Sequence, residues 1–91
     1  MKIRISPKMD IKLKNIQKKN KKLFAQIEKQ ILIFSKNPKH PSLRVHKLTG
    51  EMKNIWSISI TRSIRAVYIL ENDEAYFYKI GTHDQVYRSN F

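Results

Sequence analysis

Several side chains in the second half of the chain could move a proton or hold a negative charge. An imidazole has an ordinary pKa near neutral, so it can donate or accept a proton at physiological pH. An arginine fork binds phosphate through paired hydrogen bonds, lysine adds a point charge, and tyrosine adds a hydroxyl and a stacking surface. The candidates of these types are His46, Lys47, Arg62, Arg65, Lys79, His83 and Tyr87.

Expected strands determine where three of these candidates point. His83 follows Gly81-Thr82 at a strand end, where side chains reach solvent. Lys79 precedes His83 by two steps of two residues, so both should face the same side. Arg65 lies inside an apolar strand, opposite in parity to Tyr68, and an unpaired charge buried there would be costly.

Structural roles remain open for the same residues. His83 could be a loop histidine bonded to the backbone, Arg65 could form a buried salt bridge, and Tyr87 could simply pack. His46 could lie at the surface of an edge strand. We interpret Trp56 as core, because it shares an apolar strand face.

The spacing of apolar residues predicts the elements that must position these side chains. We expect strands over residues 2–6, 43–48, 55–61, 64–70 and 75–80, and helices over 8–19 and 21–36. Asn20 separates the helices, Asn37-Pro38 ends the second one, and Gly50 and Gly81 are breaks. The last three strands follow one another through short turns, which favours an antiparallel meander.

The expected architecture is α+β in the order β-α-α-β-β-β-β, with residues 1–91 in a single domain. Two N-terminal helices would pack on one face of a small, mainly antiparallel sheet. The other face would be open, and a site could lie there.

The positive charge of the chain is concentrated in its first half. Residues 1–50 hold fourteen Lys/Arg and two acids, whereas residues 51–91 hold five of each, and the net charge is +12. Such a field favours a polyanion, whether RNA, DNA, an anionic membrane or an acidic protein. A lysine-rich solvated surface is the plainer interpretation.

Composition excludes several classes of protein. The chain has no cysteine, so it has neither a disulfide framework nor a thiolate metal site, and three scattered histidines have poor ligand spacing. Two glycines cannot form a phosphate-cradling loop. No apolar run predicts a membrane span or a signal peptide, and we expect a cytoplasmic protein without cofactor.

Three segments together resemble the RelE/ParE toxin superfamily, with YafQ-like mRNA interferases the most similar. The segments are HPSLRVHKLTG, IWSISITRSIRAVYIL and YKIGTHDQVY, and the resemblance covers nearly the whole chain. It implies a metal-independent endoribonuclease that cuts mRNA at the ribosomal A site and inhibits translation. ParE members share the scaffold but poison DNA gyrase and cleave nothing, so that alternative stays open, as does an inactive nucleic-acid-binding domain.

The resemblance also implies roles for individual residues. His83 matches the histidine of a G-T-H ending that is catalytic in YafQ-like members, and Arg65 matches an R-x-x-Y pattern. Lys79 stands where those members carry a catalytic arginine, Tyr87 matches a family aromatic, and His46 matches a further histidine. The expected RNA-binding residues are Lys47, Arg62, Lys18, Lys19, Lys21 and Lys22.

The match to the family is incomplete, and its partners are inferred. Ser59 stands where several members place a basic residue or histidine, and Ser63 and Ile64 replace other active-site residues. The implied partners are a cognate antitoxin protein, mRNA and ribosomal RNA. An acidic amphipathic helix is the expected form of an antitoxin against this basic surface.

Overall fold

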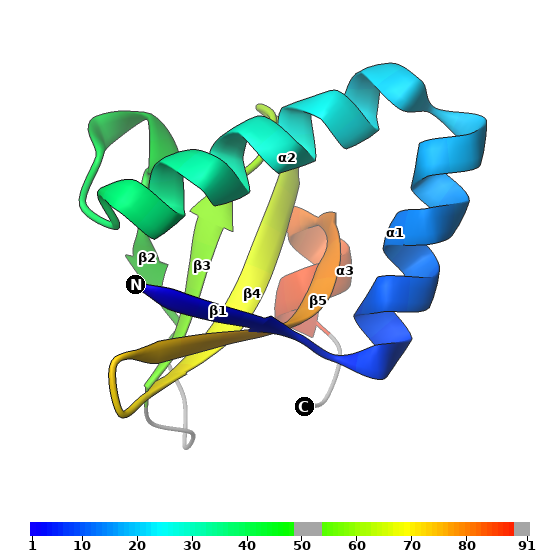
Figure 1. Ribbon diagram of the computed structural model, residues 1–91. Helices are drawn as coiled ribbons and strands as arrows, with labels where there is room; N and C mark the ends of the chain where they lie inside the picture. Colours follow the sequence, from blue (N-terminus) through cyan, green and yellow to red (C-terminus); the bar gives the residue numbers. More distant parts are fainter. Residues whose placement is uncertain (49–53, 89–91) are drawn as a thin grey trace.

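A five-stranded sheet carries two long helices on one face and a short helix on the other (Figure 1). The computed structural model describes residues 1–48 and 54–88; Gly50, an expected break, lies outside them. The elements are β1 Lys2–Ile5, α1 Pro7–Lys19, α2 Lys21–Lys36, the 3₁₀ turn η1 Pro41–Leu43, β2 His46–Lys47, β3 Ile55–Ser59, β4 Ile64–Glu71, β5 Glu74–Thr82 and α3 His83–Arg88.

The strands lie in the order β1-β5-β4-β3-β2. β1 pairs in parallel with β5, and the other neighbouring pairs are antiparallel. The expected α+β class and the β3-β4-β5 meander are therefore confirmed. None of the helices in the described part of the chain is long and apolar enough to cross a membrane.

Polar caps set the boundaries of the two long helices. Ser6 caps α1, because its hydroxyl accepts a hydrogen bond from the Met9 amide at 3.1 Å, and Pro7 stands at the first helical position. Asn20 ends α1 and begins α2: its amide donates to the Ile16 carbonyl, and its side chain accepts from the Leu23 amide. One asparagine thus forms the joint between the helices.

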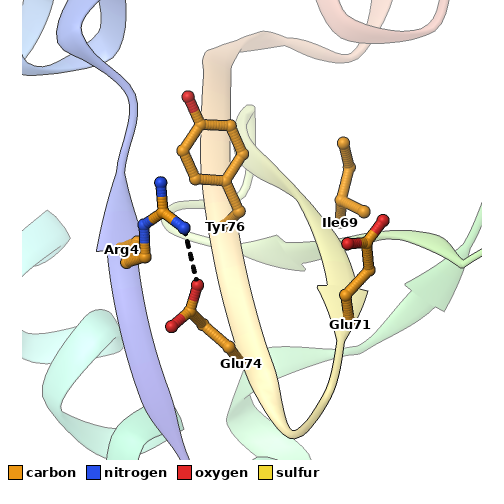
Figure 2. A pocket seen from close by; sticks show the side chains of 5 residues that line it. All are labelled: Arg4, Ile69, Glu71, Glu74 and Tyr76. Atoms are coloured by element: carbon orange, nitrogen blue, oxygen red, sulfur yellow. Dashed lines mark hydrogen bonds and ion pairs between the residues drawn. The ribbon is translucent and has the colours of Figure 1, made fainter.

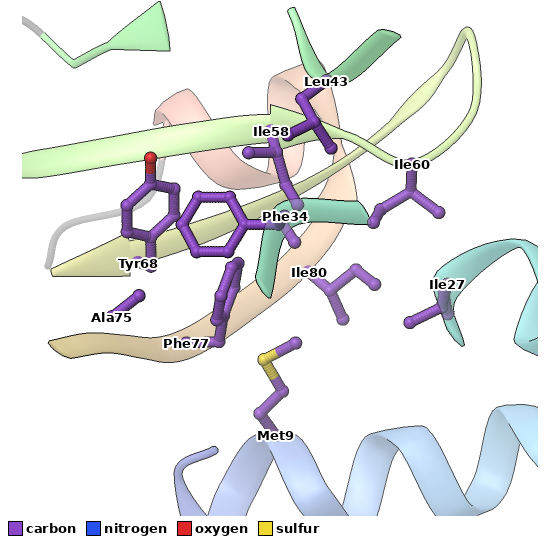
Figure 3. Packing of buried hydrophobic residues seen from close by; sticks show 11 residues of the cluster. Met9, Ile27, Phe34, Leu43, Ile58, Ile60, Tyr68, Ala75, Phe77 and Ile80 are labelled. Atoms are coloured by element: carbon purple, nitrogen blue, oxygen red, sulfur yellow. The ribbon is translucent and has the colours of Figure 1, made fainter. Parts of the chain in front are cut away.

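The main core lies between the sheet and the long helices (Figure 3). Phe34 of α2 contacts Tyr68 of β4 and Phe77 of β5 edge-on, with ring centroids 4.9 and 5.4 Å apart. Burial raises the pKa of the Tyr68 hydroxyl to about 12. Trp56 packs against this core, as expected.

Two strand predictions were wrong in extent. The strand expected over 43–48 is the two-residue β2, because Leu43 ends a 3₁₀ turn and Arg44 has a left-handed backbone (φ 45°). Gly81 does not end β5, which continues to Thr82. A third helix, α3, follows at once and was not expected.

The second face of the sheet is therefore only partly open. Val86 of α3 is fully buried in a small cluster with Leu48, Ile55 and Val67. The order of elements gains a final helix, and that helix carries two of the candidate residues.

Candidate active site

A capping box places α3 against the sheet. The Thr82 hydroxyl accepts a hydrogen bond from the Gln85 amide at 3.3 Å, and the Gln85 side chain accepts from the Thr82 amide at 2.8 Å. Six residues are too few for a stable isolated helix, so this cap and the buried Val86 determine whether α3 forms. Gly81 allows the close approach, since an added Cβ would lie 2.5 Å from Gln85 Oε1.

The His83 imidazole is exposed at the start of α3. Its side chain is 75% accessible, and its ring lies 4.2 Å from the Tyr87 ring, centroid to centroid. Asp84 Oδ1 lies 3.9 Å from Nδ1, a contact that counts as an ion pair only when the imidazole is protonated. His83 is thus a helix N-terminal residue supported by an aromatic ring, in place of the expected strand-end residue, and it does not lie behind α1 and α2.

Tyr87 and Ser57 connect this histidine to Arg65. A hydrogen bond of 2.8 Å joins the Tyr87 hydroxyl to Ser57 Oγ, and Arg65 Nε donates to the same oxygen at 3.0 Å. Ser57 is fully buried. The four residues His83, Tyr87, Ser57 and Arg65 form a continuous chain of contacts from an exposed imidazole to a guanidinium, which we call the contact chain.

The Arg65 guanidinium is held by neutral oxygen atoms. Nη2 donates to the Arg44 carbonyl at 2.6 Å and to the Ser57 carbonyl at 3.3 Å. No carboxylate pairs with Arg65 among residues 1–48 and 54–88, so the salt-bridge interpretation is wrong there. The guanidinium keeps its positive charge and is fixed in orientation, which suits binding of an anion.

One row of paired residues crosses the sheet on this face. Lys79 pairs with Val67, Val67 with Ser57, and Ser57 with His46. Directly paired residues point to the same face, so Lys79 and His46 flank Ser57 from the two sides. Three strand spacings separate them, about 14 Å between backbones.

Lys79 lies in an unfavourable environment for its charge. Burial lowers the pKa of its amine, and the positive charges of Lys12 and Lys8 lower it further. Lys12 belongs to α1 and donates to the Ile80 carbonyl at 2.7 Å. Three lysines therefore lie near one another beside β5, and an anion there would relieve their repulsion.

Lys79 and His46 lie in the row of paired residues beside the contact chain, and the structure places the other candidates away from it. Lys47 pairs with Trp56, and its amine lies 5.8 Å from the centre of the indole ring, on the other face from His46. Arg62 is exposed in the β3–β4 turn. The other four are exposed around the α1–α2 joint: Lys18, Lys19, Lys21 and Lys22.

Comparisons with known proteins find similarity in structure only. No family model matches the sequence, and no curated protein matches it. A YoeB/ParE toxin from Agrobacterium tumefaciens superposes with a TM-score of 0.77 at 20% identity, over 91% of this chain and 99% of the other. YafQ from E. coli superposes at 0.74 with 18% identity, over 93% and 96%. YoeB from a Staphylococcus aureus YoeB–YefM complex gives 0.74 at 21%, over 91% and 97%.

The chain has the fold of these YoeB/ParE and YafQ toxins. Its long helices, mixed sheet and strand meander are those expected from the sequence resemblance. The toxin fold alone leaves the activity open, since one scaffold can carry different functions.

Ser57 is the residue of the candidate site that the sequence analysis did not single out. Strand parity places it only on the face opposite the apolar residues and gives it no role. A small polar residue on a buried strand, two positions before the equally polar Ser59, was the available signal. Ser59 itself bonds locally, donating to the Thr61 carbonyl at 2.9 Å.

In the described part of the chain, no three side chains of the metal-binding types lie close enough together to hold a metal ion. The contact chain offers an imidazole, a phenol, a hydroxyl and a guanidinium, and the Lys79 amine lies in the row of paired residues beside it. These are groups that can transfer protons and bind phosphate.

Proposed function

We propose that the protein is the toxin of a toxin–antitoxin pair and an endoribonuclease that cuts mRNA on the ribosome without a metal ion. The single observation that carries the proposal is the contact chain. It connects an exposed imidazole, through Tyr87 and Ser57, to the fixed guanidinium of Arg65. The toxin fold and the resemblance of residues 40–87 to YafQ-like sequences support it.

The proposed reaction is an internal transfer at one phosphodiester. The 2′-oxygen of the ribose attacks the adjacent phosphorus, its proton passes to a base, and a 2′,3′-cyclic phosphate forms. The bond to the 5′-oxygen breaks, and that oxygen takes a proton from an acid. His83 exchanges one of these protons, while Arg65 and Lys79 stabilise the charge that develops on the phosphoryl oxygens.

Tyr87 acts as a positioning residue in this proposal. Its hydroxyl is engaged by Ser57 and its ring by His83, so it orients the imidazole relative to Arg65. His46 approaches from the other side of Ser57 and is the second candidate for proton transfer. Ser59, Ser63 and Ile64 do not supply the side chains that YafQ-like members use, so these few groups carry the chemistry.

Binding of ribosomal RNA is assigned to the basic helices. Lys18, Lys19, Lys21 and Lys22 are exposed at the α1–α2 joint, and exposed lysines bind phosphates with little sequence preference and strong salt dependence. Arg62 and Lys47 extend the basic surface toward the sheet. The first half of the chain would bind the ribosome while the contact chain acts on mRNA.

A cognate antitoxin is the proposed protein partner. The E. coli DinJ–YafQ structure with the same fold is a toxin–antitoxin complex, superposing with a TM-score of 0.75 at 20% identity. A chain with net charge +12 attracts an acidic, amphipathic segment. Co-purification with the product of a neighbouring short reading frame tests this partner.

The decisive experiment is His83→Ala. Because the side chain is mostly exposed, the variant should melt within a few degrees of the wild type. We expect it to lose mRNA cleavage on translating ribosomes and toxicity on expression. A folded His83→Ala protein that cuts and kills undiminished would remove the catalytic assignment. Parallel assays of gyrase supercoiling test the ParE alternative, which needs no histidine.

A further inference from the structure

A basic pocket opens beside the contact chain, between α2, η1 and the β3–β4 turn. It is a hollow of about 430 Å³, and its lining includes four cationic side chains, namely Lys29, Arg44, Arg62 and Arg65. No carboxylate belongs to its lining among the described residues. We call this hollow the basic pocket.

In another pocket on the same sheet, a carboxylate neutralises the cationic side chain. Figure 2 shows Arg4 of β1 reaching the Glu74 carboxylate at 3.1 Å, with Glu71 in the same lining and the Tyr76 ring 5.1 Å from the guanidinium carbon. The cation there is already neutralised. Among the described residues, no carboxylate in the lining of the basic pocket neutralises its cations. Their mutual repulsion would be relieved by a bound anion.

Hydrogen bonds from Gln30 join the elements that form the floor of the basic pocket. Gln30 of α2 is buried, and its side-chain amide donates to the Ser42 carbonyl at 3.2 Å and to the Ser59 carbonyl at 2.9 Å. These bonds fasten α2 to η1 and to β3. At the rim, His40 Nδ1 accepts from the Ser42 amide, so Nε2 carries the proton and adds another donor to the lining.

Arg44 lies at the rim of the basic pocket in a backbone conformation that arginine rarely adopts. Its backbone is left-handed, with φ 45° and ψ 55°, a region that glycine and asparagine occupy more readily. Arg65 binds the Arg44 carbonyl at 2.6 Å and fixes this turn. Backbone strain at a non-glycine residue often accompanies function, and here it delivers an exposed guanidinium to the rim.

We propose that the basic pocket binds the backbone phosphate next to the bond that is cut, on the same RNA strand. The inference rests on the proposed function. Arg65 belongs to both sites: its Nε faces Ser57, and its Nη2 faces Arg44. A strand with the reacting phosphate at Arg65 therefore meets the rim with a neighbouring phosphate. Lys29, Arg44 and His40 bind this phosphate and hold the strand in register.

The test separates binding from cutting by using an RNA that cannot be cut. The probe is a short single-stranded RNA with 2′-O-methyl groups throughout, and its binding is measured by fluorescence anisotropy over a range of KCl concentrations. The pocket variant carries Lys29→Gln and Arg44→Asn. Asparagine tolerates the left-handed turn and leaves the carbonyl for Arg65, so the fold should persist. Arg44→Gly with Lys29→Gln is the second version.

The matched control, Lys2→Gln with Lys36→Gln, removes the same charge from exposed positions outside the basic pocket. We expect the pocket variant to bind about tenfold more weakly, with a salt slope reduced by roughly one. The control should change affinity by less than about twofold, since its phosphate contacts stay intact. Equal weakening in pocket variant and control, unchanged affinity in the pocket variant, or no binding by the wild type would each overturn the inference.

Failure of the inference and failure of the proposed function give different results. If the pocket variant loses affinity while the wild type cuts no RNA, the phosphate-binding inference is supported and the proposed nuclease function is wrong. If the wild type cuts mRNA while the pocket variant and the control bind the RNA probe with equal affinity, the proposed nuclease function is supported and the phosphate-binding inference is wrong.

Discussion

At the scale of single residues, one buried serine contacts two side chains of the proposed site. Ser57 Oγ contacts both the Tyr87 hydroxyl and Arg65 Nε. Ser57→Ala would leave both groups without that partner, and we expect it to lower the free energy of unfolding by about 2 kcal/mol. Tyr87→Phe keeps the ring beside His83 and should cost about 1 kcal/mol. Urea denaturation measures both.

The double variant tests whether these bonds form one network. If Tyr87 acts through Ser57, the double variant should lose less stability than the sum of the single variants, by about 0.5 kcal/mol or more. Both single variants should also slow cleavage, because the orientation of Arg65 and His83 depends on them. Strict additivity together with unchanged cleavage would show that the contact chain is incidental packing.

Lys79 should make the free energy of unfolding depend on pH, because folding lowers the pKa of its amine. The folded pKa of its amine lies below the ordinary 10.5, so between these two values the unfolded chain binds more protons than the folded chain. The free energy of unfolding should therefore rise with pH through that window. In Lys79→Met this rise should be smaller, whereas Lys36→Met at an exposed position should keep it. Thermal melts from pH 7 to pH 10 measure the difference.

At the scale of elements, α3 determines whether the site exists. Its capping box is the two reciprocal bonds between Thr82 and Gln85. Thr82→Ala removes one of them and should cost about 1 kcal/mol, while cleavage should fall further as His83 and Tyr87 lose their common support. Gln85→Glu keeps an acceptor at the same position and is the control. Cleavage by Thr82→Ala at the wild-type rate would show that α3 is not needed.

The long elements could be predicted from sequence, whereas β2 was predicted with too great a length and α3 was not predicted. A thirteen- and a sixteen-residue helix carry repeated apolar spacing and end at Asn20 and at Asn37-Pro38. α3 has six residues and one fully buried side chain, Val86, so periodicity gives almost no signal. The signal was chemical, because threonine and glutamine three residues apart are typical of a capping box at a helix start.

The sequence could predict which residues belong to the candidate site, but it could not predict which of them contact one another. Parity placed Arg65 correctly on the face of Val67 and Ile69. No local pattern could show that Tyr87 meets Ser57, because thirty residues separate them and α3 must first turn back onto the sheet. The basic pocket depends in the same way on Gln30 and on the turn at Arg44, which tertiary contacts determine.

At the scale of the whole molecule, the two halves of the chain divide the proposed work. The excess charge belongs to residues 1–50, and much of it lies on helices packed against one face of the sheet. The contact chain lies on the other face, where α3 packs against the sheet. A basic surface can thus hold a large polyanion while the opposite face remains accessible to a single strand.

This division predicts that affinity for the ribosome and the chemical step can be separated by mutation. Changing Lys18, Lys19, Lys21 and Lys22 to glutamine lowers the net charge from +12 by four, at positions that are all exposed, so stability should change little. Ribosome binding should weaken, and its salt slope should fall by roughly 0.7 to 0.9 for each phosphate that the protein no longer neutralises. Single-turnover cleavage of ribosome-bound mRNA at saturating protein should stay near the wild-type rate, because the contact chain is untouched.

A control with four exposed lysines changed elsewhere decides between local contact and overall charge. Suitable positions are Lys2, Lys14, Lys36 and Lys39. If net charge alone governs affinity, both quadruple variants should weaken by the same amount, since each gives up four charges in the same field. If the α1–α2 joint is the ribosome contact, only the first variant should show the reduced salt slope. Equal slopes in both would move the contact away from the joint and leave the long helices with a purely structural role.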